Sequence, residues 1–194
     1  QLSALCARLP VPVIPAPGDP TPSALPLRIL EDLPRRIRVG DSHQTGFIAA
    51  GVLLAVTGSA AVLWPVITGA GAVSPWAWYL VAATAAAAAL RARVWDSASC
   101  KAWLLGHPYL LTTVLTVAFA ATGEYTAMWW SLAVLTVLVA VWIVVALNPR
   151  IADPDSYSLP MRRLVGFLAS ALDASVLPVM AYLVGLFSWA LNGF

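Results

Sequence analysis

The sequence predicts an all-α membrane protein: a polytopic transmembrane helical bundle of five membrane-spanning helices, with a proline-rich cytoplasmic connector at its start. Hydrophobic residues make up 60% of the chain, charged residues make up only 10%, and the mean hydropathy is +0.82. An ordinary soluble domain is about half apolar and about a quarter charged. Several apolar runs also approach about 20 residues, the length at which a helix crosses a hydrocarbon layer of about 30 Å. These observations place the chain among membrane proteins.

Residues 1–45 are predicted to lie outside the membrane domain of residues 46–194, and to hold the end of a preceding helix followed by the connector. Residues 10–34 contain eight of the 15 prolines in the chain. Because proline has no backbone N–H, we expect neither a regular helix nor a central strand there. The chain begins with Gln1 rather than methionine, so we expect it to be part of a longer protein.

The first two predicted spans differ in composition. Residues 46–67 carry no charge and end at a Trp-Pro pair, which suits a membrane interface. Residues 75–91 begin in an aromatic cluster, pass through VAATAAAAAL and stop at Arg91. Alanine is a strong helix former, and small side chains allow helices to approach closely. The second span is therefore expected to pack among other helices.

Three further spans complete the prediction. Residues 102–122 are interrupted by His107-Pro108, where we expect a kink or a late helix start. Residues 127–147 form the most lipophilic run of the chain. The last span covers residues 164–191.

The positions of the basic residues predict how the chain is oriented in the membrane. All 11 lie in three segments, residues 1–45, 91–101 and 150–163, and the alternate connections contain none. Lysine and arginine accumulate in the cytoplasmic loops of membrane proteins. We therefore expect a multi-pass protein of the inner (plasma) membrane, with residue 1 on the cytoplasmic side and the carboxyl terminus on the periplasmic side. An odd number of spans agrees with that placement.

The segment before the first span is the candidate for contacts with partner proteins. It mixes charged side chains with Leu and Ile, so it suits a protein surface or a layer of lipid head groups. Its candidate residues are Arg28, Glu31, Asp32, Arg35, Arg36 and Arg38. A role in topology alone is the alternative, because each arginine gains about 1 kcal/mol beside an anionic leaflet.

Two polar residues stand out inside the predicted spans. Asp173 is either part of a proton relay or a carboxylate near the boundary, bonded to a neighbouring helix or to head-group water. The second interpretation is favoured, because only His107 offers another titratable group within the spans. His107 precedes a proline and is expected to satisfy a freed carbonyl. No metal-ligand spacing surrounds it.

No catalytic, cofactor-binding or metal site is predicted. The chain lacks CxxC, HExxH, GxxxxGKS/T and GxSxG patterns, and its basic residues form no nucleic-acid patch. We therefore expect a structural role rather than an enzyme. Half of a secondary transporter, or another channel subunit, is the alternative, and broken helices with polar groups near the midplane would distinguish it. An intramembrane enzyme is less favoured, because Asp173 has no second carboxylate at matching depth.

Several motifs occur in a characteristic order. RLPVPVIP opens the connector, RARVW closes a short span, and YSLPMRR with VLPVMAYLVGLFSW finishes the chain. In this order the chain resembles the carboxyl-terminal half of EccD, the multi-spanning membrane component of mycobacterial type VII (ESX) secretion systems. The resemblance implies a longer protein with a cytoplasmic ubiquitin-like domain and eleven membrane helices, of which this chain supplies the last five.

The same resemblance implies the partners. Two copies of the protein would pair around a lipid-filled vestibule, and the connector would contact other subunits on the cytoplasmic side. Those subunits are EccB, EccC and EccE, and EccC supplies the energy. The protein is also expected to contact membrane lipids, and no nucleic acid.

Overall fold

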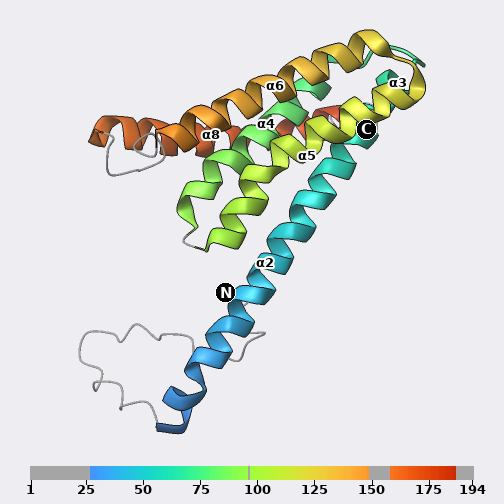
Figure 1. Cartoon of the computed structure of the whole chain (residues 1–194). Coiled ribbons are helices and arrows are strands. Elements are labelled where there is room, and N and C mark those ends of the chain that lie inside the picture. Colours follow the sequence, from blue (N-terminus) through green and yellow to red (C-terminus); the bar gives the residue numbers. More distant parts are fainter. Residues whose placement is uncertain (1–26, 96, 149–157, 187–194) are drawn as a thin grey trace. The chain divides into compact units, whose positions relative to one another are not determined.

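The computed structural model describes residues 27–95, 97–148 and 158–186. Every regular element within these ranges is helical, which confirms the predicted all-α class (Figure 1). The chain divides into two units, residues 1–50 and 51–194.

Helix α2 (Leu27–Val62) begins earlier than the sequence predicts. Its first residues lie in the proline-containing stretch that was expected to be non-helical, so that expectation is wrong for residues 27–34, while residues 10–26 lie outside the described part. The run LRILEDL is rich in helix-forming residues. Pro34 lies inside the helix, and its carbonyl accepts a hydrogen bond from Arg38 Nε at 3.4 Å.

The first predicted span is interrupted near its end. Helix α2 stops at Val62, and the short helix α3 (Trp64–Ile67) follows. Pro65 lies in the first turn of α3 and cannot donate a hydrogen bond to the preceding turn. The backbone N–H groups of Val66 and Ile67 instead bond to the Leu63 carbonyl, each at 3.0 Å. The expected single helix over 46–67 is therefore two helices.

Helix α4 (Pro75–Arg91) has the bounds that the sequence predicts for the second span. The Ser74 hydroxyl caps its start by accepting a hydrogen bond from the Trp76 N–H at 3.3 Å. Proline in the first turn needs no intrahelical partner for its nitrogen, so Pro75 suits this position. A 3₁₀ turn, η1 (Ala92–Val94), continues the helix beyond Arg91.

Helices α5 (Ala98–Thr122) and α6 (Tyr125–Leu147) form an antiparallel pair joined by a tight turn. Helix α5 runs through Pro108 and begins at Ala98, before the predicted start at residue 102, so of the two expected effects of Pro108 the late helix start does not occur. Gly123 ends α5 with a φ of 81°, a conformation that glycine adopts without steric cost.

Helix α8 (Leu159–Leu183) begins and ends before the predicted bounds of 164–191. Ser158 and Pro160 provide an early N-terminus, because serine is a common cap and proline fits the first turn. Gly185, with a φ of 74°, follows the end of the helix. Residues 187–191 of the predicted span lie outside the described part.

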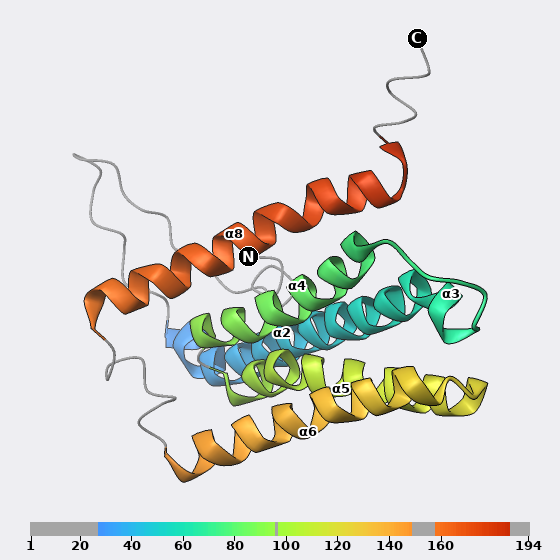
Figure 2. The ribbon, with the colours of Figure 1, turned by 90° about the horizontal axis from the view of Figure 1, so that it is seen from above.

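The second unit is a layer of helices in the order α8, α4, α5 and α6 (Figure 2). Helix α4 packs against α8 on one side and α5 on the other, and α6 packs against α5. The buried side chains of α4 include Ala77, Ala83 and Ala87, whose small size lets the neighbouring helices approach closely. Helix α6 has no buried residue among those described.

Four helical segments of the described chain are long and apolar enough to cross a membrane. They are Ile37–Val62, Ala98–Thr122, Tyr125–Leu147 and Leu159–Leu183. The most apolar is Tyr125–Leu147, with a mean hydropathy of 2.6, which agrees with its predicted lipophilicity. Helix α4, with 17 residues, is shorter than these four.

Candidate functional site

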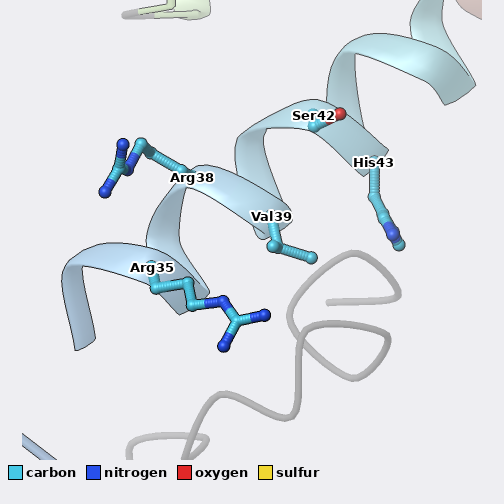
Figure 3. A pocket seen from close by; sticks show the side chains of 5 residues that line it. All are labelled: Arg35, Arg38, Val39, Ser42 and His43. Carbon is cyan, nitrogen blue, oxygen red and sulfur yellow. The ribbon is translucent and has the colours of Figure 1, made fainter. Parts of the chain in front are cut away.

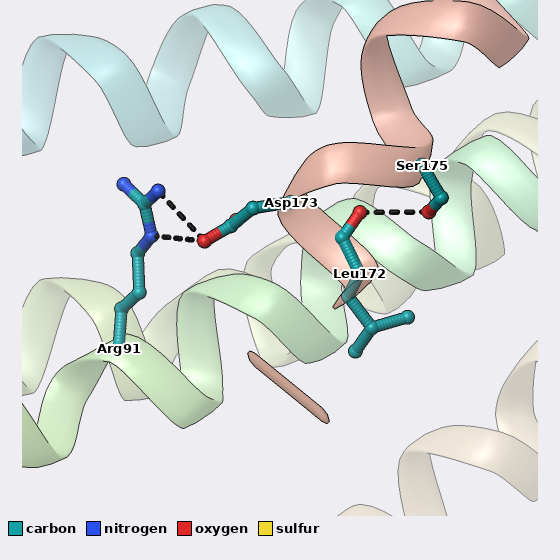
Figure 4. Close-up of polar contacts among 4 residues, drawn as sticks. All are labelled: Arg91, Leu172, Asp173 and Ser175. Carbon is teal, nitrogen blue, oxygen red and sulfur yellow. Dashed lines mark hydrogen bonds and ion pairs between the residues drawn. The ribbon is translucent and has the colours of Figure 1, made fainter. Parts of the chain in front are cut away.

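An ion pair joins helices α4 and α8 (Figure 4). Arg91 donates hydrogen bonds from Nε at 2.9 Å and from Nη2 at 2.7 Å, and both reach the same oxygen, Oδ2 of Asp173. The Arg91 side chain is 60% exposed and the Asp173 side chain is 32% exposed. Asp173 is therefore paired with a cation from a neighbouring helix.

This pairing changes how Arg91 is understood. The sequence singled out Asp173, but did not predict Arg91 as its partner. A carboxylate within a membrane helix is costly without a partner, and an arginine at the end of a neighbouring helix is a natural one. The pairing could not be predicted, because the sequence does not show that α4 and α8 are neighbours.

Two further contacts tie α4 to α8. The Ser175 hydroxyl donates to the Leu172 carbonyl at 2.7 Å and lies 2.7 Å from the Tyr79 hydroxyl, so Tyr79 acts as the donor in the second bond. The rings of Trp76 and Tyr182 meet edge to face with centroids 6.3 Å apart. Tyr79 and Arg91 thus reach from α4 toward the same part of α8.

His107 lies in the interior of the second unit. Its side chain is 1% exposed, and neither ring nitrogen has a hydrogen-bond partner among the described residues. The expected bond to a freed carbonyl is therefore not formed. In the described ranges, no group of His, Cys, Asp and Glu is arranged to hold a metal ion.

The basic segment belongs to the first unit. Arg35 and Arg38 are exposed on the same stretch of α2 as Val39, Ser42 and His43 (Figure 3). Positively charged groups on one stretch of helix can receive an acidic surface. The structure does not describe the side chains of the other four candidates, Arg28, Glu31, Asp32 and Arg36.

An apolar groove of about 780 Å³ runs between α4, α5 and α6. Alanines of α4 form one wall, and Thr112 and Ser131 belong to the other walls. The Thr116 hydroxyl, next to the groove, lies 2.9 Å from the Ser131 hydroxyl and links α5 to α6. Sequence reasoning did not find this groove, because its walls come from three separate helices.

Comparisons with known proteins give a consistent result. The family model described as "EccD-like transmembrane domain" matches residues 1–192. The chain is 68% identical over 192 residues to the ESX-3 secretion system protein EccD3 of Mycolicibacterium smegmatis, a match that covers 99% of this chain and 39% of that protein. It is 66% identical to the protein of the same name from Mycobacterium tuberculosis, with 99% and 40% covered.

A solved structure is similar as well. The chain matches a chain of the structure described as "Structure of protomer 1 of the ESX-3 core complex", with a TM-score of 0.81 and 66% identity. The match covers 96% of this chain and 41% of that one. The chain therefore spans about two fifths of the length of the relatives that it matches.

Proposed function

The chain belongs to the EccD-like transmembrane domain family, and we propose that it forms the membrane-embedded part of a structural subunit in a type VII (ESX) secretion complex. The observation that carries this proposal is the similarity to a chain of the ESX-3 core complex, at 66% identity over 96% of the chain. Identity at that level over nearly the whole chain makes a shared place in a similar assembly the simplest inference.

Within this subunit, the chain is proposed to cross the inner membrane five times, with α4 as a span in addition to the four longer helices. Helix α4 has 17 residues, a length of about 26 Å at about 1.5 Å per residue. The turn η1 adds about 6 Å, so together they match a hydrocarbon layer of about 30 Å. The arginine-bearing connections would face the cytoplasm.

Self-pairing and contacts with other subunits are part of the proposal. Helix α6 exposes Val137, Val141 and Trp142 among many apolar side chains, and has no buried residue in the described part. Such a surface lies against lipid or against another helix in the membrane. The basic residues Arg35 and Arg38 would contact acidic surfaces of EccB, EccC or EccE.

Co-purification tests the proposed role. Two copies of the full-length protein carrying different tags should be recovered together, along with EccB, EccC and EccE. Replacing Arg35 and Arg38 with Glu should weaken recovery of the partner subunits, because reversed charges repel an acidic surface. The matched control is Arg163→Glu, which reverses an exposed arginine outside this segment.

The outcomes separate the alternatives. Unchanged recovery in the Arg35 and Arg38 variant would assign these residues to topology alone. Recovery of a single copy without any partner subunit would contradict the assembly role itself.

A further inference from the structure

A cavity separate from the apolar groove lies between the end of α4 and the first half of α8, and the Arg91–Asp173 ion pair forms part of its wall. It measures about 400 Å³, and its lining includes Arg91, Arg93, Gly166, Ala169, Ser170 and Asp173. Among the described residues that line it, two arginines and one aspartate give a formal charge of +1. The cavity therefore attracts an anion.

The ion pair leaves part of this positive charge available. Arg91 directs Nε and Nη2 to a single carboxylate oxygen, and Nη1 has no bonding partner in the described ranges. Arg93 is exposed and forms no hydrogen bond or ion pair with any described residue. A planar guanidinium binds phosphate oxygens through paired N–H groups, so Arg93 and the free edge of Arg91 suit a phosphate group.

The position and size of the cavity identify the source of the phosphate. Arg91 is the last residue of α4, where an apolar helix gives way to a polar connection. In the proposed topology this is the cytoplasmic boundary of the membrane, and basic pockets between membrane helices on that side bind the head groups of anionic lipids. At about 30 Å³ for each water-sized group, the cavity accommodates about a dozen of them, enough for a phosphoglycerol head group.

Small residues keep the cavity open on the α8 side. A Cβ atom added at Gly166 would meet nothing within 4 Å. Exposed apolar side chains of the same helix, including Leu164, Phe167 and Leu168, lie beside the cavity residues along the chain and provide a surface for acyl chains.

We infer that the cavity between α4 and α8 binds the head group of an anionic phospholipid, with Arg93 and Arg91 holding its phosphate. This site lies within one copy of the chain and goes beyond the proposed role in assembly. Asp173 positions the Arg91 guanidinium, while Arg93 carries most of the contact with the lipid.

Native mass spectrometry of the full-length protein tests this inference. The protein is reconstituted in vesicles of roughly equal parts phosphatidylglycerol and phosphatidylcholine, extracted in mild detergent, and its retained lipids are counted. The unchanged protein should retain phosphatidylglycerol in preference to phosphatidylcholine. Arg93→Gln should lower that retention about fivefold, the effect of one arginine beside an anionic head group.

Matched variants separate a specific site from general surface charge. Arg93→Lys should retain more phosphatidylglycerol than Arg93→Gln, because it keeps the charge. Gly166→Leu should lower the retention of phosphatidylglycerol by filling the cavity. Gly58→Leu should leave the retention unchanged, because an added Cβ at Gly58 also meets nothing within 4 Å but Gly58 lies on a helix that does not line the cavity. Arg163→Gln removes an exposed arginine of α8 that does not line the cavity, and it should leave retention unchanged.

Three results would overturn the inference. The first is equal retention of the two lipids by the unchanged protein. The second is an equal loss in the Arg93→Gln and Arg163→Gln variants, which would indicate general surface charge. The third is displacement of the lipid by millimolar inorganic phosphate, which would identify a site for the free anion instead.

Discussion

At the scale of single residues, the polar groups of the second unit follow two patterns. Asp173 is paired with Arg91, and both side chains are partly exposed at the surface of the chain. His107 is buried with both ring nitrogens unpaired among the described residues. An exposed ion pair contributes little to stability, whereas an unpaired buried polar group carries a desolvation cost. The two residues that the sequence singled out therefore differ in their energetic role.

The ion pair makes a prediction about Asp173→Asn. This change removes the charge partner of Arg91, whose exposed guanidinium can turn to water or to head groups. We expect a loss of no more than about 1 kcal/mol in stability and normal protein export. Thermal unfolding in detergent and a secretion assay in cells measure the two effects. Complete loss of export with a normally assembled complex would favour the proton relay instead.

The environment of His107 makes a second prediction. Leucine in its place removes two unpaired nitrogens from the interior, so His107→Leu should raise the stability by about 1 kcal/mol or more. Leu111→Ala, on the same buried face of α5, should instead lower it by about 2–5 kcal/mol. The midpoint of thermal unfolding measures both. Equal destabilisation by the two changes would show that His107 has a polar partner in the intact protein.

At the scale of elements, local sequence signals account for most helix boundaries. Ser74-Pro75 begins α4 as predicted, because a capping hydroxyl and an N-terminal proline act locally. The start of α2 was missed, because the expectation weighed the prolines of residues 10–34 and not the helix-forming run after Pro26. The start of α5 lies at Ala98, four residues before the predicted start at residue 102, because the polar residues up to Lys101 were assigned to the preceding connection.

The end of α5 allows a comparison of two glycines. Gly123 has a φ of 81°, so Gly123→Ala should cost about 1 kcal/mol through strain in the left-handed region. Gly106 lies within the same helix, where an added Cβ meets nothing within 4 Å, so Gly106→Ala should add about 0.5–1 kcal/mol of stability. Thermal unfolding of the two variants under the same conditions makes the comparison. A gain for Gly123→Ala would contradict the assigned helix end.

At the scale of the whole chain, the sequence predicted the membrane class and the family, and the comparisons confirm the family. Composition and long apolar runs indicate the membrane class, because they respond to the bilayer rather than to particular neighbours. The order of motifs such as RLPVPVIP and YSLPMRR indicates the family. The Arg91–Asp173 pair, the groove between three helices and the cavity beside Arg93 were not predicted. Each depends on which helices are adjacent, and residues far apart in one sequence do not reveal it.

Labelling of single cysteines on either side of α4 tests the central claim, that α4 crosses the membrane in addition to the four longer helices. In a full-length protein in which every native cysteine, including Cys6 and Cys100, is replaced by serine, Ala70→Cys and Ser97→Cys place one thiol before and one after α4. In right-side-out membrane vesicles, an impermeant maleimide should label the first variant, and should label the second only after the membrane is permeabilised. Equal labelling of both variants in sealed vesicles would place the two ends of α4 on the same face and contradict the five-span arrangement.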